Sequence, residues 1–323
     1  DNGAFLAQFD AFFVQRTALS LAEASQLVDF CKENNKKLIF EIDDDLFEIG
    51  DRGDTHVDYK AFQMPLELLA RNADLIVTST ELLADRLRSM NPAIFVSRNA
   101  LSDRLWFSPV PSDVDFKFAA LGKRDGAEVR IVYMGTKTHA ADLALLEQPM
   151  QAIRRRYPRA RLLTIGVTGE TSDWYEAMKI PNGVSQYGDF VPWFRQLASQ
   201  VDFAVAPLVG SQFNVAKSPL KFYDYAGAGL CGLFSNVEPY KSEIEESKTG
   251  YLVENTTKDW TNALLHAIES GDEVRTIAAQ ARKEARAHNI RDAGLNLDAA
   301  IIELCGDEIP RQPASLQNLV DQT

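Results

Sequence analysis

The sequence has few cysteines, no long apolar run and no excess of basic residues. Its three cysteines, Cys31, Cys231 and Cys305, stand far apart in 323 residues, and no two form a CxxC pair. This spacing argues against a disulfide framework or a zinc knuckle and predicts a reducing, cytoplasmic compartment. No apolar run approaches the roughly 20 residues that a membrane-spanning helix needs. The start, DNGAFLAQFDAFF, also does not have the basic residues and apolar stretch of a signal peptide.

The charge balance limits the partners. The formal net charge is -12 and the isoelectric point is near 4.9. Nucleic-acid binding over a broad surface needs clustered Lys and Arg, so a nucleic-acid partner is not expected. The first residue is Asp rather than Met, which predicts that earlier residues were removed and that other domains of a longer chain are partners.

The pattern of elements predicts an α/β protein with two Rossmann-like domains that face a central cleft. Strand and helix signals alternate along the chain, which is typical of parallel sheets. Such sheets bind ligands at the carboxyl ends of their strands. The predicted division is a small or truncated N-terminal domain (1–110), a linker (111–127), a C-terminal domain (128–306) and a tail (307–323).

The predicted elements follow from periodicity and from turn residues. In the first half, strands are expected at 9–16, 37–43, 74–79 and 93–100, with helices at 20–35, 59–73 and 80–90. In the second half, strands are expected at 129–135, 160–166, 202–208, 230–235 and 250–253, with helices at 141–157, 191–200, 218–229, 258–270, 272–287 and 292–305.

Residues 213–240 are the most informative segment. Lys217 and Lys221 lie four apart at the predicted start of a helix, where free N–H groups and the helix dipole favour a diphosphate. Asp224 follows one turn later and can accept hydrogen bonds from a ribose diol. From spacing alone, an amphipathic helix with solvated lysines explains the pattern equally well.

The same segment resembles the donor-binding stretch of retaining GT-B glycosyltransferases, the group 1 or family 4-like enzymes of bacterial polysaccharide biosynthesis. Their pattern, roughly K-S-x-x-K-x-x-E-Y-A-x-x-G-x-P-x-x-x-S, is similar to K-S-P-L-K-F-Y-D-Y-A-G-A-G-L-C-G-L-F-S here. GTKTHAADL (135–143) resembles the family's first loop of the C-terminal domain. YGDFVPW (187–193) resembles its base-contacting turn. The similarity covers roughly 130–290 well and 9–107 more faintly. It implies that the domain at 128–306 binds the nucleotide sugar and that the domain at 1–110 lies on the acceptor side.

The resemblance implies roles for individual residues. Lys221 and Lys217 would steady the leaving diphosphate, and His139 would reach the phosphates or the sugar; a polar residue facing solvent is an equal alternative for His139. Asp224 would hold the ribose. The remaining implied donor-binding residues are Gly135, Thr136, Lys137, Asp189, Phe190, Ser218, Pro219 and Leu220.

Two departures from the family pattern affect the prediction. The family's first glutamate, which contacts the donor sugar, is replaced by Ala216, so the sugar must be recognised by something else. The glycine-rich acceptor loop after the first strand is also not evident. Both departures favour an alternative function, a non-catalytic GT-B-like module that binds a glycan or a partner.

EIDDDLF (41–47) places Asp43, Asp44 and Asp45 at a strand end, where crowded carboxylates are costly unless they bind something. A metal-binding DxD needs a nucleotide fold upstream, and a haloacid-dehalogenase phosphatase needs Thr or Val where Phe47 stands. An acceptor-facing loop of the cleft and a solvated cap stay open, and we favour the first.

Three further residues end strands of the same domain. Arg16 follows the first strand, and Arg98 and Asn99 follow the last, so Arg16 and Asn99 are acceptor-side candidates; satisfying strand-end carbonyls is the alternative. The basic cluster 154–161 suggests a peripheral contact with anionic lipid at the inner face of the membrane, or cations that favour a helix C-terminus.

The sequence therefore predicts a hexosyltransferase that moves a hexose from a nucleoside diphosphate sugar to a glycan or lipid-linked glycan hydroxyl. The resemblance implies retention of configuration, no metal and no cofactor beyond the donor. A sugar-nucleotide epimerase of GT-B form is a more distant alternative.

Overall fold

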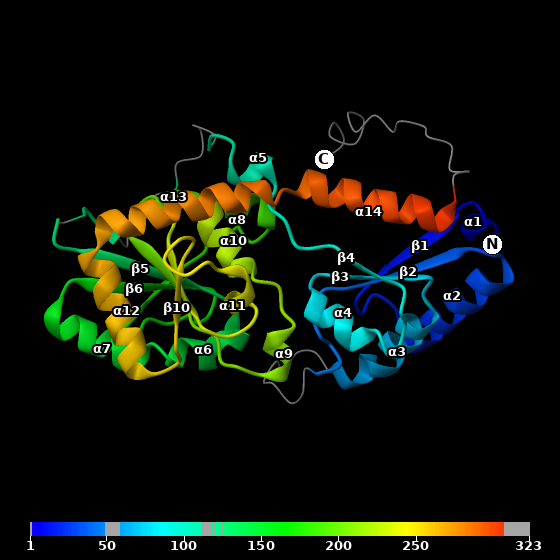
Figure 1. The fold of residues 1–323 in the computed structure, drawn as a ribbon, viewed down its shortest axis with the longest axis horizontal. Helices are drawn as coiled ribbons and strands as arrows, with labels where there is room; N and C mark the ends of the chain where they lie inside the picture. The colour runs from blue at the N-terminus through cyan, green and yellow to red at the C-terminus, as the bar shows by residue number, and fades with distance from the viewer. Residues whose placement is uncertain are drawn as a thin grey trace.

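The structure is a computed structural model that describes residues 2–48, 59–110, 116, 118, 121–124 and 126–306. The predicted tail (307–323) and much of the predicted linker (111–127) lie outside the described residues. Two parallel sheets carry the fold, each with its own helices (Figure 1). The α/β class with two Rossmann-like domains is confirmed.

The N-terminal sheet has four parallel strands in the order β1-β2-β3-β4. Strands that are neighbours in the sheet are also consecutive in the chain, and a crossover that contains a helix joins each strand to the next. Ser20 caps the first of these crossover helices, and its capping box with Glu23 fixes where the helix begins. The elements are α1 (Asn2–Leu6), β1 (Ala11–Gln15), α2 (Leu21–Glu33), β2 (Lys37–Ile42), η1 (Tyr59–Phe62), α3 (Gln63–Asn72), β3 (Leu75–Thr78), α4 (Glu81–Leu87), β4 (Ile94–Val96) and α5 (Asp103–Trp106).

The C-terminal sheet has six parallel strands in the order β10-β9-β8-β5-β6-β7. Both of its faces are buried, since Ile131 and Tyr133 of β5 enter one core cluster while Val132 enters another. Its elements are β5 (Val129–Met134), η3 (Lys137–His139), α6 (Ala140–Ala144), α7 (Glu147–Arg156), β6 (Ala160–Ile165), β7 (Glu176–Met178), α8 (Tyr187–Ala198), β8 (Phe203–Ala206), α9 (Gln212–Val215), α10 (Leu220–Ala228), β9 (Gly232–Ser235), α11 (Tyr240–Glu243), β10 (Tyr251–Val253), α12 (Thr257–Glu269), α13 (Gly271–Ala287) and α14 (Ile290–Cys305).

The chain crosses between the domains twice. After β4 it enters the C-terminal domain, where Trp106 of α5 is fully buried against α8 and α10. At the end, α14 runs back along the N-terminal domain (Figure 1). At the junction, the Leu101 N–H donates to His288 O at 3.0 Å and the Ile290 N–H donates to Leu101 O at 3.0 Å. The two crossings are therefore hydrogen-bonded to each other.

Most predicted elements are confirmed, and two predictions of local structure were wrong. The helix expected over 141–157 is two helices, α6 and α7, because Leu145 and Leu146 turn the chain between them. The turn expected over 187–193 is the start of α8, which begins at Tyr187, four residues before the predicted 191. β7, α1, α5, α9 and α11 were not predicted; each is only three to five residues long.

Candidate functional site

A cleft of about 1260 Å³ lies between the two domains. The residues that follow β1, β2, β5, β6 and β8 all reach it, so the cleft is at the carboxyl ends of both sheets, as the crevice rule for α/β sheets predicts. Its lining residues come mostly from the C-terminal domain. They are Arg16, Asp44, Leu46, Met134, Gly135, Thr136, Lys137, Thr138, His139, Ala140, Ala141, Asp142, Ile165, Gly166, Ile180, Phe190, Val209, Phe213, Asn214, Lys217 and Lys221.

The floor of the cleft is formed where β5 and β6 end in glycine. Gly166 has φ +75°, and a Cβ there would lie 2.4 Å from the carbonyl oxygen of Gly135. The Gly135 N–H in turn donates to Ile165 O at 3.0 Å. Backbone approaches backbone this closely only without side chains, which opens the cleft above Gly135, Thr136 and Lys137.

Lys217 and Lys221 are brought together beside this floor. Lys221 lies in the first turn of α10, and Lys217 precedes that helix, with its Nζ 4.6 Å from the centre of the Phe213 ring. Desolvation in the cleft, and then the neighbouring charge of Lys217, lower the pKa of Lys221 to about 8. Two cations held this close, at a helix N-terminus, are suited to an anion carrying more than one charge.

His139 of η3, in the loop after β5, lies next to Lys221. Its Nε2 lies 3.4 Å from Nζ of Lys221, and its Nδ1 lies 2.6 Å from Oδ2 of Asp142. Burial lowers the pKa of His139; Lys221 and Lys217 lower it further, while the hydrogen bond to Asp142 opposes them. The imidazole is thus neutral at pH 7, with Nε2 directed at a lysine rather than at solvent. The solvent-facing alternative for His139 is wrong.

Asp224 lies one helical turn after Lys221 and does not line the cleft itself. Burial raises its pKa from 3.8 to about 7, although Lys221 acts in the opposite direction. Its Oδ1 is buried and has no hydrogen-bond partner among the described residues. A buried carboxylate oxygen without a donor is costly, and a ligand hydroxyl would satisfy it.

The remaining predicted donor residues occupy mixed positions. Phe190 lines the cleft, whereas Asp189 is exposed, and the N–H groups of both already donate to Gln186 O within the first turn of α8. Ser218, Pro219 and Leu220 do not line it. Pro219 has no N–H group, so of these three residues only Ser218 and Leu220 have backbone donors to offer.

The three aspartates of the N-terminal domain separate in the structure. Asp43 and Asp44 pair with Arg16, at 3.2 Å and 3.6 Å, whereas Asp45 is 2% exposed and pairs with Arg86. Only Asp44 and Arg16 line the cleft. Burial raises the pKa of Asp44, and Lys217 on the other domain lowers it. Asp44 therefore faces the lysines, whereas Asp45 holds α4 to the end of β2.

Arg16 has a left-handed backbone, with φ 47°. Its N–H donates to Glu41 O at 2.8 Å, which keeps the residue next to β2 as the chain turns into the cleft. A non-glycine residue in this region is uncommon and costs about 1 kcal/mol or more. Asn99 does not line the cleft; its neighbour Arg98 lies 3.8 Å from Glu243 of α11.

Ala216, which replaces the family's first glutamate, is a packing residue. It is fully buried and belongs to the core cluster of the N-terminal domain. Its carbonyl oxygen accepts a hydrogen bond from Thr80 Oγ1 at 2.8 Å, across the domain boundary. The position is occupied by a contact between domains, so it has no room for a sugar-binding carboxylate.

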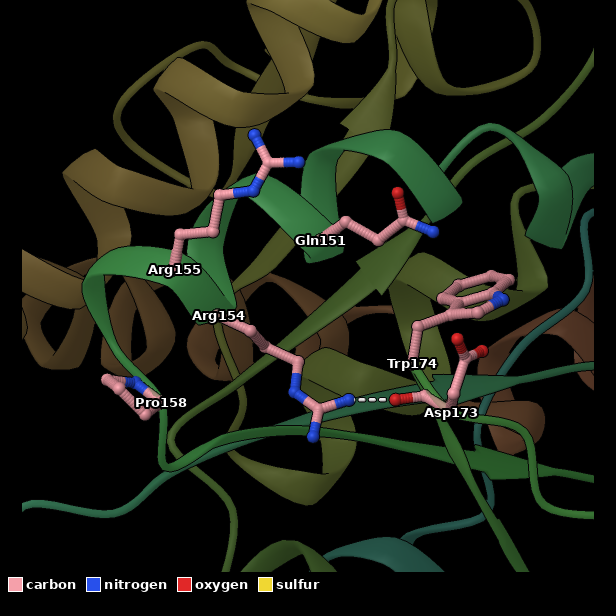
Figure 2. A pocket seen from close by; sticks show the side chains of 6 residues that line it. All are labelled: Gln151, Arg154, Arg155, Pro158, Asp173 and Trp174. Carbon is pink, nitrogen blue, oxygen red and sulfur yellow. Dashed lines mark hydrogen bonds between the residues drawn. The ribbon is translucent and has the colours of Figure 1, made fainter.

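The basic cluster lies far from the cleft and is largely paired. Arg154 donates to the backbone oxygen of Asp173 beside Gln151, Arg155, Pro158 and Trp174 (Figure 2). Arg156 pairs with Glu269 at 2.7 Å, and Arg161 pairs with Glu128 and Glu176 at 2.7 Å and 2.5 Å. Arg156 and Arg161 are therefore paired with carboxylates, whereas Arg154 contacts a neutral carbonyl oxygen. Membrane contact stays a prediction.

Sequence reasoning missed Asp142, Asn214 and the apolar end of the cleft formed by Ile165 and Ile180. Asp142 had a signal, because a carboxylate three residues after a histidine lies on the same helical face. Ile165 and Ile180 had none, since apolar residues at strand ends usually enter a core. Within the described residues, no group of three or more His, Cys, Asp or Glu is placed to hold a metal ion, and no helix there is long and apolar enough to cross a membrane.

Solved structures share this arrangement of two facing sheets. Anabaena HepE, in complex with UDP and glucose, superposes with a TM-score of 0.65 at 12% identity, over 93% of this chain and 79% of HepE. Sucrose-phosphate synthase from Thermosynechococcus elongatus superposes at 0.64 and 13% identity, over 93% and 75%. A glycosyltransferase from Rickettsia africae superposes at 0.62 and 12%, over 94% and 80%. The fold is GT-B.

The family comparison agrees with this GT-B fold. Residues 128–270 match the family model Glycosyl transferases group 1. The match covers less than half of the GT-B chain and falls on the domain that carries Lys217, Lys221 and His139. A search of curated protein sequences found no match. The resemblance to group 1 glycosyltransferases is therefore confirmed in the C-terminal domain.

Proposed function

We propose that this protein transfers a hexose from a nucleoside diphosphate sugar to a glycan or lipid-linked glycan hydroxyl, with retention of configuration and without a metal. One observation carries the proposal: Lys217, Lys221 and the start of α10 form a cationic site inside the interdomain cleft. A diphosphate is the ligand whose charge and size suit that site.

The rest of the cleft accommodates the other parts of such a donor. Phe190, Ile165 and Ile180 offer an apolar end for a nucleobase. Asp224 has an unpartnered oxygen one turn beyond Lys221, behind the cleft lining, and we assign it to the ribose diol on the family pattern. The domain that carries this site matches the glycosyl transferase family, and HepE, which shares the fold, has been solved in complex with UDP-glucose.

Catalysis in this proposal comes from positioning and from charge. The bond from the anomeric carbon to the phosphate oxygen breaks as the acceptor hydroxyl oxygen bonds to that carbon, and the acceptor proton passes to the departing diphosphate. The two ammonium groups stabilise the charge that builds up on the diphosphate. The acceptor enters from the side of Arg16 and Asp44, the lining residues of the N-terminal domain that face the lysines. We infer retention because the family pattern implies it. No carboxylate for a double displacement is evident among the described residues, so the acceptor would attack the face from which the diphosphate leaves.

A panel of nucleotides tests the proposal. UDP, GDP, dTDP and CMP are added separately to the protein, with and without EDTA, and the thermal melt is recorded. We expect one nucleoside diphosphate to raise the melting temperature equally with and without EDTA, because the lysines replace a metal. Incubation with the matching sugar donor, with and without acceptor glycans, then separates transfer from epimerisation.

The second candidate is a non-catalytic module that binds a glycan or a partner. The buried Ala216 favours it, because a contact that catalytic relatives reserve for the donor sugar is used here for packing. No melting response to any nucleotide would select this module over the enzyme.

A further inference from the structure

We propose that Asp142 is a positioning residue for the diphosphate site, acting on Lys221 through the imidazole of His139. This inference rests on the proposed function. Asp142 is 5% exposed and both of its carboxylate oxygens are used. Oδ2 contacts Nδ1 of His139 at 2.6 Å, and Oδ1 accepts the backbone N–H of Val209 at 2.6 Å.

The first contact determines the tautomer of His139. A carboxylate only accepts hydrogen bonds, so Nδ1 carries the proton and Nε2 is left with its lone pair. That lone pair lies 3.4 Å from Nζ of Lys221, which has protons to donate. His139 thus accepts from the ammonium group and holds it at the cleft. The other tautomer would point an N–H at a cation.

The second contact ties this arrangement to the opposite loop. Val209 follows β8, and its carbonyl oxygen accepts a hydrogen bond from Asn214 Nδ2 at 2.7 Å. The peptide groups of Val209 are therefore fixed on both sides, by Asp142 at the N–H and by Asn214 at the carbonyl. Asp142 joins the loop that carries His139 to the loop that leads to Lys217.

Asparagine cannot replace Asp142 without a loss. Asp142 accepts from two donors, whereas the amide of asparagine has one accepting oxygen. In Asp142→Asn, either the Nδ1–H of His139 or the N–H of Val209 must face an amide NH₂ group. The hydrogen bond to the buried ring is charge-assisted only with the carboxylate, so we expect the ring contact to be lost.

The charged groups around Lys221 determine in which direction its pKa shifts in Asp142→Asn. Lys217 lowers its pKa, whereas Asp142 and Asp224 raise it, and the neutral ring of His139 accepts from it. The other titratable groups near Asp142 are the phenols of Tyr133 and Tyr240, whose pKa values burial holds well above their usual range. Removing the Asp142 charge and reversing the tautomer both favour a neutral Lys221.

The test is the pH dependence of UDP binding, measured by calorimetry at pH 7, 8 and 9. For the wild type we expect the affinity to fall about twofold between pH 7 and pH 8, because the ammonium titrates near pH 8. For Asp142→Asn we expect a midpoint about one pH unit lower and a loss of about fivefold over the same interval. Asp202→Asn is the matched control.

Like Asp142, Asp202 accepts a backbone N–H, that of Arg130 at 2.8 Å; it also pairs with a cation, Arg124. Unlike Asp142, it precedes β8 and therefore lies at the end of that strand away from the cleft. We expect its asparagine variant to keep the wild-type midpoint. A midpoint in Asp142→Asn that matches the wild type would overturn the inference and leave the proposed function intact. A wild type that binds no nucleoside diphosphate would overturn both.

A double-mutant cycle shows whether Asp142 acts through the ring. His139→Asn removes the acceptor for Lys221, so this variant should show the same midpoint as Asp142→Asn, and the double variant should lose no more than either single variant. Additive losses would instead assign Asp142 to the Val209 loop and overturn the inference. Imidazole ¹⁵N spectra of the wild type, with His139 assigned by its absence in His139→Asn, should show the Nδ1–H tautomer; the Nε2–H tautomer would overturn the inference even if Asp142→Asn does not fold.

Discussion

Asp224→Asn is expected to stabilise the protein while weakening nucleotide binding. The folded state holds this carboxylate in a buried position with one unpartnered oxygen and a pKa of about 7, against 3.8 for an ordinary aspartate. Each unit of pKa is worth about 1.4 kcal/mol, so the ionised group costs the folded state up to about 4 kcal/mol above pH 7. Lys221 loses a nearby carboxylate in the variant, which reduces the expected net gain to about 1–2 kcal/mol.

The sign of the pH dependence follows from the direction of the shift. Because the folded pKa is raised, the wild type binds more protons when folded than when unfolded between about pH 4 and pH 7. Its stability from this group is fully present below pH 4 and is lost as the pH rises to 7. Asparagine does not titrate, so the advantage of the variant should be small at pH 5 and larger at pH 8.

Urea unfolding followed by tryptophan fluorescence measures this difference. All four tryptophans, Trp106, Trp174, Trp193 and Trp260, are buried, and they report on the C-terminal domain. The exposed Asp189 gives the control, since Asp189→Asn should leave the midpoint unchanged. Calorimetry with UDP should show about tenfold weaker binding to Asp224→Asn, for the loss of one charged hydrogen-bond acceptor. A variant that is less stable than the wild type at pH 8, or an advantage that does not grow with pH, would refute the reasoning.

Three further predictions concern the cleft and the contact between domains. Lys221→Ala should lower kcat by about 10²–10³-fold with little change in the KM for acceptor, because the ammonium acts on charge that develops in the transition state; steady-state kinetics check this, and near-normal turnover removes Lys221 from the mechanism. Gly166→Ala should cost at least about 2 kcal/mol in thermal unfolding, because a Cβ would meet Gly135 O at 2.4 Å. Gly183→Ala has a similar φ but open space, so it should cost about 1 kcal/mol; equal losses would contradict the backbone contact. Ala216→Glu should destabilise the protein by at least about 3 kcal/mol, because it buries an unpaired charge between the domains. The control, Ala216→Ser, should change the melting temperature little. A folded glutamate variant with normal stability would show that the position is open.

The sequence allowed the alternation of strands and helices to be predicted because that alternation is local. Ser20 with Glu23, the glycine after β5, and Gly229 after α10 mark element ends through short-range chemistry, and an element begins or ends at each of them. The start of α8 was placed four residues too late because 187–193 was taken as a turn, whereas the structure has these residues, with Pro192, inside the helix. A proline within the first two turns of a helix is tolerated more easily than one in the middle.

The site was predictable only in part, for a physical reason. Lys217 and Lys221 are adjacent on one helix end, so their proximity follows from spacing. The contact of His139 with Lys221 joins residues 82 positions apart, and no local pattern determines it. The same holds for Asp44, which faces Lys217 only because the two sheets meet at their carboxyl ends. Asp45 leaves the acidic cluster at 43–45 to pair with Arg86, whereas Asp43 and Asp44 share Arg16, because successive residues at a strand end point in different directions.

The two segments that connect the domains, near Leu101 and Asn289, are hydrogen-bonded to each other, and this limits how the domains can move. Two connections that lie side by side and share backbone hydrogen bonds act as one link, which restricts the relative motion of the domains at this point. Swivelling of one lobe past the other would have to break the bonds between Leu101, His288 and Ile290. Parting the domains would also withdraw Ala216 from the core of the N-terminal domain and break its hydrogen bond with Thr80.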